Sequence, residues 1–292
     1  MEETRFYDDV AGFFAVTRDL YEAEPVRHTT VLSVIHALSD APQADAAPPV
    51  LISLHGNDGA LRGAALWTPP WPLALSGIHC DDVPLLVKEL LSSHPELDSV
   101  MGPRDVADSF AAAWSAATSR PVRTILDLRL YRLADLVVPQ VDGRARIATV
   151  DDVDLLAQHD RAFSLEANAH RTHTLAEAAD GARRLLALGA GYVIWEVDGV
   201  PVSSAAAKVP TAGASRIGPV YTPPEHRRHG YGAAATAAAA QWAQAVGAQE
   251  VLLYTDLANP TSNGVYQRIG FRPVSDYVEL AFDPPGRRDP AA

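Results

Sequence analysis

The sequence predicts an α+β fold with two units of similar architecture. The order of expected elements in the first half returns in the second half: helices, a hairpin, a strand, a helix, a strand, a helix and a last strand. A chain of 292 residues is long enough for two domains of roughly 150 residues each. Hydrophobic residues make up 48% and charged residues 21%, the balance of a globular protein rather than a disordered one.

The elements of the first half follow from apolar spacing and turn residues. Apolar residues at helical spacing predict helices over 10–20 and 29–38. A β-hairpin is expected next, because the turn formers at 56–59 separate apolar runs at 50–54 and 61–68. The remaining expected elements are strands at 73–76, 97–101 and 123–131 and helices at 81–91 and 105–117.

The second half repeats this order after a connection over 134–147. Its central hairpin is predicted by the dipeptide Asp198-Gly199, which is typical of a tight turn between strands. A polar stretch over 164–174 separates its first two helices. The other expected elements are strands at 145–148, 192–197, 200–208, 216–221, 250–255 and 273–282 and helices at 149–163, 175–188, 232–246 and 262–268.

Charge and cysteine content exclude several classes of function. The formal net charge of −12 disfavours broad binding to nucleic acid or to an anionic membrane. The only cysteine, Cys80, allows no internal disulfide framework and no cysteine-built metal site, which indicates a reducing compartment. The acidic N-terminus has no apolar core, and no apolar run approaches the ~18 residues of a membrane span. We therefore expect a cytoplasmic protein without a metal cofactor and without nucleic-acid or membrane partners.

The segment from Gly218 to Gly232 has the composition of an anion-binding loop. It passes from a strand end through Pro223-Pro224 into a loop with two arginines and two histidines, and it enters a helix near Gly232. Glycine lets backbone N–H groups approach a ligand closely, and the first turn of a helix leaves about four N–H donors unpaired. The helix dipole adds roughly half a positive charge there. The segment predicts a site for a phosphate-bearing ligand.

Two familiar phosphate motifs fit this segment poorly. The P-loop pattern Gly-x-x-x-x-Gly-Lys-Ser/Thr is absent from the chain. The residues Gly230-x-Gly232-x-x-Ala235 match a dinucleotide fingerprint, but that motif places its first glycine directly after a strand. Here eight residues, two of them proline, separate Tyr221 from Gly230. The dinucleotide interpretation is therefore disfavoured.

Two segments in order resemble the GNAT acetyltransferase superfamily. The loop Thr222-x-Pro224-x-x-Arg227-x-x-Gly230-x-Gly232-Ala233 is similar to the acyl-coenzyme-A loop of that superfamily. The downstream run from Asn259 through Tyr266 to Gly270-Phe271 is similar to its Asn-x-x-Ala-x-x-x-Tyr-x-x-x-Gly-Phe segment. The resemblance covers roughly 144–282 well and covers 1–132 only by element order, as in tandem-GNAT proteins. It implies two domains, each a mixed, mostly antiparallel central sheet flanked by helices. Residues 1–133 would form a degenerate copy without a phosphate loop, and 144–292 the acyl-CoA-binding catalytic domain.

The resemblance also implies roles for individual residues. The main chain of Tyr221 and Thr222 would pair with the pantetheine amides, and the N–H groups from Arg228 to Ala233 would hold the pyrophosphate. Tyr266 would sit beside the coenzyme sulfur and donate a proton to the leaving thiolate, since a tyrosine stays protonated at neutral pH. The implied coenzyme-binding residues are Tyr221, Thr222, Arg227, Arg228, His229, Gly230, Tyr231, Gly232, Ala233, Asn259, Asn263 and Tyr266.

The general base is the least defined part of the expected site. In many relatives a glutamate on the strand before the loop acts as the base, but 214–220 contains no carboxylate. Glu166 is the leading substitute, because the polar stretch that holds it lines the acceptor pocket in the family. Each of the other candidates is more simply interpreted as a solvated side chain: His170, His173, Glu196, Glu279, His226 and His229.

These inferences predict an N-acyltransferase. It would move an acetyl or another short acyl group from acyl-CoA, with acetyl-CoA as co-substrate, to an amine on a small molecule, by direct attack in a ternary complex. The alternative is a non-catalytic acyl-CoA sensor, favoured by the missing strand carboxylate. An aminoacyl-tRNA-dependent transferase is a third option, disfavoured by the intact loop and the acidic composition. The acceptor, the acyl length and the oligomeric state stay open.

Overall fold

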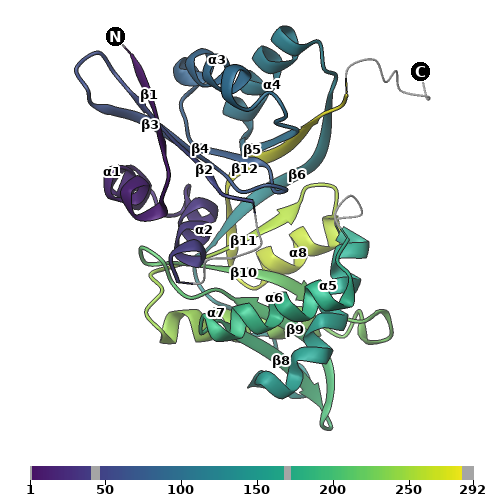
Figure 1. Cartoon of the computed structure of the whole chain (residues 1–292). Helices are drawn as coiled ribbons and strands as arrows, with labels where there is room; N and C mark the ends of the chain where they lie inside the picture. The colour runs from purple at the N-terminus through teal and green to yellow at the C-terminus, as the bar shows by residue number, and fades with distance from the viewer. Residues whose placement is uncertain (1, 41–46, 168–171, 285–292) are drawn as a thin grey trace. The chain divides into compact units, whose positions relative to one another are not determined.

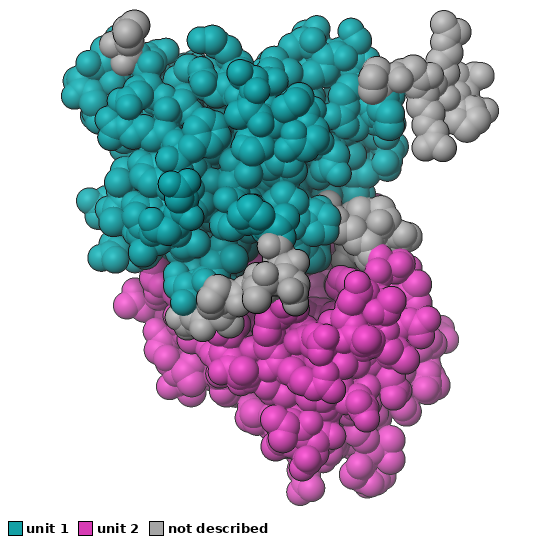
Figure 2. All heavy atoms as spheres, in the orientation of Figure 1, with its two compact units in different colours: residues 1–129, 275–292 teal, residues 130–274 magenta. Residues whose placement is uncertain are grey.

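Two units divide the chain in the computed structural model, which describes residues 2–40, 47–167 and 172–284 (Figure 1). Unit 1 comprises residues 1–129 and 275–292 and unit 2 residues 130–274, coloured teal and magenta in Figure 2. The C-terminal end of the expected domain of 144–292 belongs to unit 1 in the structure. There, residues 277–281 of strand β12 (Phe271–Phe282) pair antiparallel with strand β5 (Ser99–Pro103). The functional meaning of the two predicted domains stays a prediction.

Unit 1 is a mixed sheet with helices on both faces. Its strands follow the order β1-β2-β3-β4-β5-β12-β6, in which β4 and β5 pair in parallel and the pairs β1–β2, β2–β3, β3–β4 and β5–β12 are antiparallel. The bounds of its other elements are β1 (Glu3–Tyr7), α1 (Val10–Ala23), α2 (Thr29–Asp40), β2 (Val50–His55), β3 (Leu61–Trp67), β4 (Leu73–Gly77), η1 (Cys80–Asp82), α3 (Val83–Ser93), α4 (Arg104–Thr118) and β6 (Val122–Leu133).

Side-chain alternation along β2 and β3 explains why this sheet is covered on both sides. Leu51 and Leu66 pack in one core cluster with residues of α1 and α2. Their neighbours Ile52 and Trp67 pack in a second cluster with residues of α3 and α4. Successive strand side chains point to opposite faces, so a strand buried on both faces is apolar throughout. This arrangement accounts for the continuous apolar runs of the first hairpin.

Unit 2 repeats the architecture. Its strand order is β6-β11-β10-β9-β8-β7, with β10 and β11 in parallel and the pairs β7–β8, β8–β9 and β9–β10 antiparallel. The bounds are β7 (Arg144–Ile147), η2 (Val150–Asp152), α5 (Val153–Ala167), α6 (Leu175–Ala187), β8 (Gly191–Val197), β9 (Val200–Ala207), β10 (Ala214–Tyr221), η3 (Pro224–His226), α7 (Tyr231–Ala245), β11 (Glu250–Asp256) and α8 (Pro260–Arg268).

The two faces of this sheet carry different helices. Val193 of β8 packs with the alanines of α7, among them Ala239 and Ala243, which are fully buried. Ile194, the next residue of β8, packs in a cluster with Leu156 of α5 and Ala182 of α6. The small side chains of α7 leave its axis close to the sheet. Because α7 packs on this face, its first turn and the predicted phosphate loop follow the end of β10 on the same side of the sheet.

The predicted α+β class and the mixed, mostly antiparallel sheets flanked by helices are confirmed. Both predicted hairpins form, as β2–β3 and β8–β9. One strand and one short helix are absent from the sequence-based expectation: β1, five residues whose pattern of exposure does not alternate, and η3 in the predicted loop. No helix within the described residues is long and apolar enough to cross a membrane.

Candidate functional site

Strands β10 and β11 separate beside the predicted loop. Their parallel register runs from Ala214 opposite Glu250 to Ile217 opposite Leu253 and ends there, although β10 continues to Tyr221. On its other side β10 shifts register against β9 between Ile217 and Val220. The last residues of β10 therefore present an edge that an extended ligand can pair with in the manner of an added strand.

The loop after β10 is shaped by left-handed backbone at two residues. Arg228 has a φ of 66° and Gly230 a φ of 83°. Gly230 is the N-cap of α7 and supplies no side-chain cap, and the first helical bond runs from the N–H of Ala234 to the carbonyl of Gly230 (3.0 Å). The N–H groups of residues 231–233 precede that bond, so they are free to bind an anion.

The base of the loop is fixed by short polar contacts. The Ser203 hydroxyl donates to the Tyr221 carbonyl at 2.9 Å and lies 2.8 Å from the Thr222 hydroxyl. The Arg227 Nε donates to the Thr222 carbonyl at 2.9 Å. A Cβ on Gly232 would lie 3.0 Å from the Thr222 Oγ1, so glycine lets the helix start close to the strand end. Each carbonyl keeps a second lone pair for a ligand.

Glu166 lies in the last turn of α5 and meets the loop directly. The Arg227 Nη2 donates to both of its carboxylate oxygens, at 2.9 and 2.6 Å, and the Tyr221 hydroxyl donates to Oε1 at 3.1 Å. Burial, followed by the charge of Glu166, raises the pKa of Tyr221. The structure thus brings the candidate base together with two predicted coenzyme-binding residues, but as an ion pair rather than as a free carboxylate.

The other candidate bases have different surroundings. His173 contacts Asp160, with Nδ1 and Oδ2 3.0 Å apart, and Arg146 donates to Glu196 at 2.5 Å. Glu279 is buried in the part of β12 that belongs to unit 1. His229 stacks on Tyr231 with ring centroids 5.4 Å apart. His170 lies outside the described residues.

Tyr266 is half-buried on α8, with its ring against that of Phe271 (centroids 6.2 Å apart). Burial raises its pKa to about 12. The predicted proton donor is therefore protonated throughout the neutral range.

Asn259 and Asn263 hold the helix that carries Tyr266. The Asn259 side chain accepts from the N–H of Ser262 at 3.0 Å, which caps α8. The Asn263 amide donates to the carbonyls of Asp256 (3.0 Å) and Asn259 (2.8 Å), and its oxygen accepts from Tyr131 (3.1 Å). Both N–H donors of Asn263 are therefore used within the chain. Its predicted contact with the coenzyme stays a prediction.

Sequence reasoning missed His159. This residue of α5 is 5% exposed, its Nδ1 lies 2.8 Å from the Ser204 hydroxyl, and its ring centroid is 5.3 Å from that of Tyr221. Burial lowers its pKa to about 4, so the imidazole is neutral at pH 7. The sequence did contain a signal for its burial, because His159 lies three residues after the apolar Leu156 and therefore on the same helix face.

Comparisons with known proteins agree with this geometry. Residues 156–271 match the Acetyltransferase (GNAT) family. A GCN5-related N-acetyltransferase from Kribbella flavida is similar in structure, with a TM-score of 0.57 and 23% identity over 88% of this chain and 95% of its own. Another from Sphaerobacter thermophilus has a TM-score of 0.63 and 15% identity over 97% and 96%. A tandem GNAT protein from the clavulanic acid biosynthesis pathway has a TM-score of 0.60 and 15% identity over 98% and 100%.

The predicted resemblance to the GNAT superfamily is thereby confirmed, and the family match supports an acetyltransferase that uses acyl-CoA. A search of the curated proteins found no match. Within the described residues, no cluster of histidine, cysteine, aspartate or glutamate has a geometry that could hold a metal ion.

Proposed function

We propose that the chain transfers an acetyl or another short acyl group from acyl-CoA to an amine on a small molecule, by direct attack in a ternary complex. The main support for the proposal is the course of the chain from β10 to α7. The last residues of β10 are not paired with β11, and the loop after them leads to the start of α7, where no side chain caps the helix. One stretch of chain thus offers an extended edge for an amide-containing arm and N–H donors for a phosphate.

The donor set fits a pyrophosphate. The N–H groups of residues 231–233 have no helical acceptor, and Arg228 and His229 are exposed in the same loop. A residue other than glycine at position 230 would have to keep a left-handed backbone, and a Cβ at position 232 would lie 3.0 Å from the Thr222 Oγ1. Residues 228–233 would hold the pyrophosphate, and the main chain of Tyr221 and Thr222 the pantetheine arm.

Positioning is the larger contribution to such a transfer. Alignment of two bound reactants lowers a barrier by roughly 7–11 kcal/mol, whereas one acid or base contributes about 10²–10⁴-fold. The coenzyme supplies the activated acyl group when bound. Tyr266 keeps its proton at neutral pH because burial holds its pKa at about 12. Its hydroxyl would hydrogen-bond to the leaving thiolate and supply a proton as negative charge develops on the sulfur.

Glu166 is proposed as the base for the attacking amine. It can act only after Arg227, which occupies both carboxylate oxygens, turns away from it. A pyrophosphate in the loop gives that guanidinium another anion to bind. Coenzyme binding would therefore precede deprotonation of the amine.

Glu166→Gln tests this role. We expect kcat to fall about 100-fold, because the amide cannot take a proton. The Kd for acetyl-CoA should stay within about threefold, since the mutation leaves Arg227 free for phosphate. Glu225→Gln, an exposed carboxylate in the same loop, is the matched control. An unchanged kcat in Glu166→Gln would remove Glu166 from the mechanism.

The proposed function itself is tested by release of free coenzyme A from acetyl-CoA across a panel of small amines. We expect one or more amines to give thiol release above the rate without acceptor. Calorimetric binding of acetyl-CoA with no release for any amine would favour the sensor, which the absence of a carboxylate on β10 and the ion pair of Glu166 also favour. No binding at all would contradict both.

A further inference from the structure

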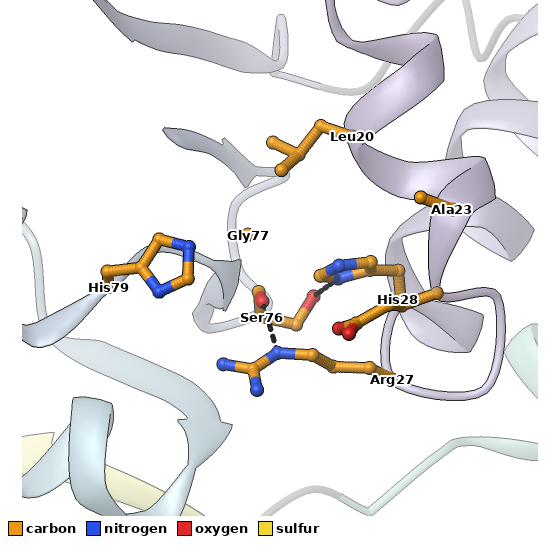
Figure 3. Close-up of a pocket in the computed structure, with 8 residues that line it drawn as sticks. Leu20, Ala23, Arg27, His28, Ser76, Gly77 and His79 are labelled. Atoms are coloured by element: carbon orange, nitrogen blue, oxygen red, sulfur yellow. Dashed lines mark hydrogen bonds between the residues drawn. The ribbon is translucent and has the colours of Figure 1, made fainter. Parts of the chain in front are cut away.

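Unit 1 contains a cavity that the proposed function does not use (Figure 3). Its volume is about 220 Å³, and it lies where the end of α1 and the connection from α1 to α2 meet the end of β4. The β4–β5 pairing joins Leu73 to Val100 and Ala74 to Met101 and ends there, although β4 continues to Gly77. Ser76 and Gly77, which line the cavity, come after the last residues that pair with β5, although Gly77 still pairs with Ala64 of β3.

Polar groups gather around Ser76 on one wall of the cavity. The Arg27 Nε donates to the Ser76 carbonyl at 3.1 Å, and the His28 Nδ1 lies 3.1 Å from the Ser76 hydroxyl. Both contacts are drawn in Figure 3. Ser76 is 5% exposed and His28 3% exposed, so this wall is buried rather than a surface patch.

The guanidinium of Arg27 is held in place with its terminal nitrogens available. The Arg27 carbonyl accepts from the Tyr277 hydroxyl at 2.7 Å, and Nε is fixed by Ser76. Within the part of the chain that the structure describes, the two terminal nitrogens have no hydrogen-bond or ion-pair partner. A guanidinium anchored through Nε presents its remaining N–H groups as a fork that matches a carboxylate.

The balance of charge on the lining favours one negative group in the ligand. Burial, and then the nearby Arg27 and His79, lower the pKa of His28 to about 4, so His28 is a neutral hydrogen-bonding group at pH 7. Arg27 is the permanent positive charge of the lining. Glu24 is exposed at the rim and would repel a second carboxylate.

A further polar atom lies behind this wall. The Tyr21 ring packs edge-on against His28, with centroids 5.3 Å apart, and it is fully buried. Its hydroxyl has no hydrogen-bond partner among the described residues. A Cβ on Gly77 would lie 2.8 Å from the Tyr21 ring, so glycine is required where the strand passes it. The wall of the cavity is therefore backed by a buried hydroxyl that makes no hydrogen bond within the described residues.

We propose that this cavity is a binding site for a small monocarboxylate. The carboxylate would lie against the guanidinium of Arg27, with Ser76 and His28 as hydrogen-bonding neighbours, and the apolar part against Leu20 and Ala23. A cavity of about 150 Å³ holds benzene, so 220 Å³ accommodates a molecule of roughly ten non-hydrogen atoms or fewer. The proposal is independent of acyl transfer in unit 2.

The experiment is calorimetric titration of the full chain with propionate, lactate, benzoate, glycine and succinate, and with propionamide, lactamide and benzamide. We expect at least one monocarboxylate to bind with a Kd below about 1 mM, and its amide or the dicarboxylate succinate to bind at least tenfold more weakly. No binding by any monocarboxylate, or equal binding by acid and amide, overturns the proposal.

Two variants locate the binding. Arg27→Gln should weaken carboxylate binding at least tenfold, whereas Arg18→Gln, an exposed arginine of α1 whose guanidinium lies over Phe14, should leave it unchanged. Ala23→Phe places a bulky side chain at the cavity wall and leaves Arg27, Ser76 and His28 in the chain, so we expect it to abolish binding as well, and it serves if Arg27→Gln fails to fold. Wild-type carboxylate affinity in either folded variant overturns the site. Acetyl-CoA affinity, measured in parallel, should not change, which separates this test from that of the proposed function.

Discussion

Gly230→Glu is expected to weaken acetyl-CoA binding at least 100-fold. Gly230 has a φ of 83°, a conformation that costs an L-residue about 1–2 kcal/mol. The new carboxylate would also stand at the start of α7, where the proposed pyrophosphate lies, and add like-charge repulsion. A glutamate that relieves this strain by moving the backbone displaces the N–H donors of the loop, and one that keeps the conformation places its charge beside the ligand. Since 1.4 kcal/mol corresponds to a tenfold change in Kd, a loss of about 2.8 kcal/mol by either route gives the 100-fold change. Calorimetry with acetyl-CoA measures it.

Gly199→Glu is the control for this prediction. Gly199 has a φ of 80° and no atom within 4 Å of an added Cβ, and it lies in the β8–β9 turn rather than in the loop. The same substitution there introduces the same strain and the same charge. We expect its acetyl-CoA affinity to match the wild type. Similar losses in both variants would mean that the loss comes from the fold, and unchanged affinity in Gly230→Glu would contradict the phosphate assignment.

Tyr266→Phe should lower kcat by about 10²–10³-fold and leave the Kd for acetyl-CoA within about twofold. Phenylalanine keeps the ring packed against Phe271, so the variant removes only the hydroxyl. Turnover with a saturating amine and calorimetry with acetyl-CoA separate the two effects. Tyr7→Phe, which removes a hydroxyl bonded to Ser53 in unit 1, is the control. Full turnover in Tyr266→Phe would exclude the proton-donor role.

The pH profile gives the same residue a second test. Burial raises the pKa of Tyr266 to about 12, so the acid stays protonated as the pH rises through the alkaline range and is lost only near pH 12. An alkaline decline of kcat below about pH 10 must then come from another group. Tyr266→Phe should retain any such decline. Its disappearance in the variant would show that Tyr266 titrates there.

Most elements of the fold could be predicted from local patterns in the sequence. The apolar runs and turn dipeptides that predict β2–β3 and β8–β9 act over a few residues, and the spacing of Arg227, Gly230 and Gly232 is itself local. The pair of Glu166 and Arg227 joins residues 61 positions apart and depends on where α5 ends. The strand at 273–282 was similarly visible, but its pairing with β5 was not. Long-range pairing is set by tertiary packing, which a single sequence does not display.

The start of α3 illustrates how the two halves differ. Asp81 and Asp82 occupy the turn before this helix, and Asp82 is buried and paired with Arg62 at 2.6 Å. Carboxylates there already complement the helix dipole and repel phosphate. The prediction that the first half lacks a phosphate loop draws support from this arrangement.

Strands β6 and β12 each contribute residues to both units, which limits the truncations that leave a unit with all of its strands. Residues 122–129 of β6 belong to unit 1 and 130–133 to unit 2. In β12 the first residues, 271–274, belong to unit 2 and the rest, 275–282, to unit 1. A segment cut at 130–274 loses the last residues of β12, while 1–129 loses the strand that pairs with β5. A truncation from either end therefore cannot remove one unit and keep every strand segment of the other, whereas an internal deletion of 130–274 would leave all residues of unit 1.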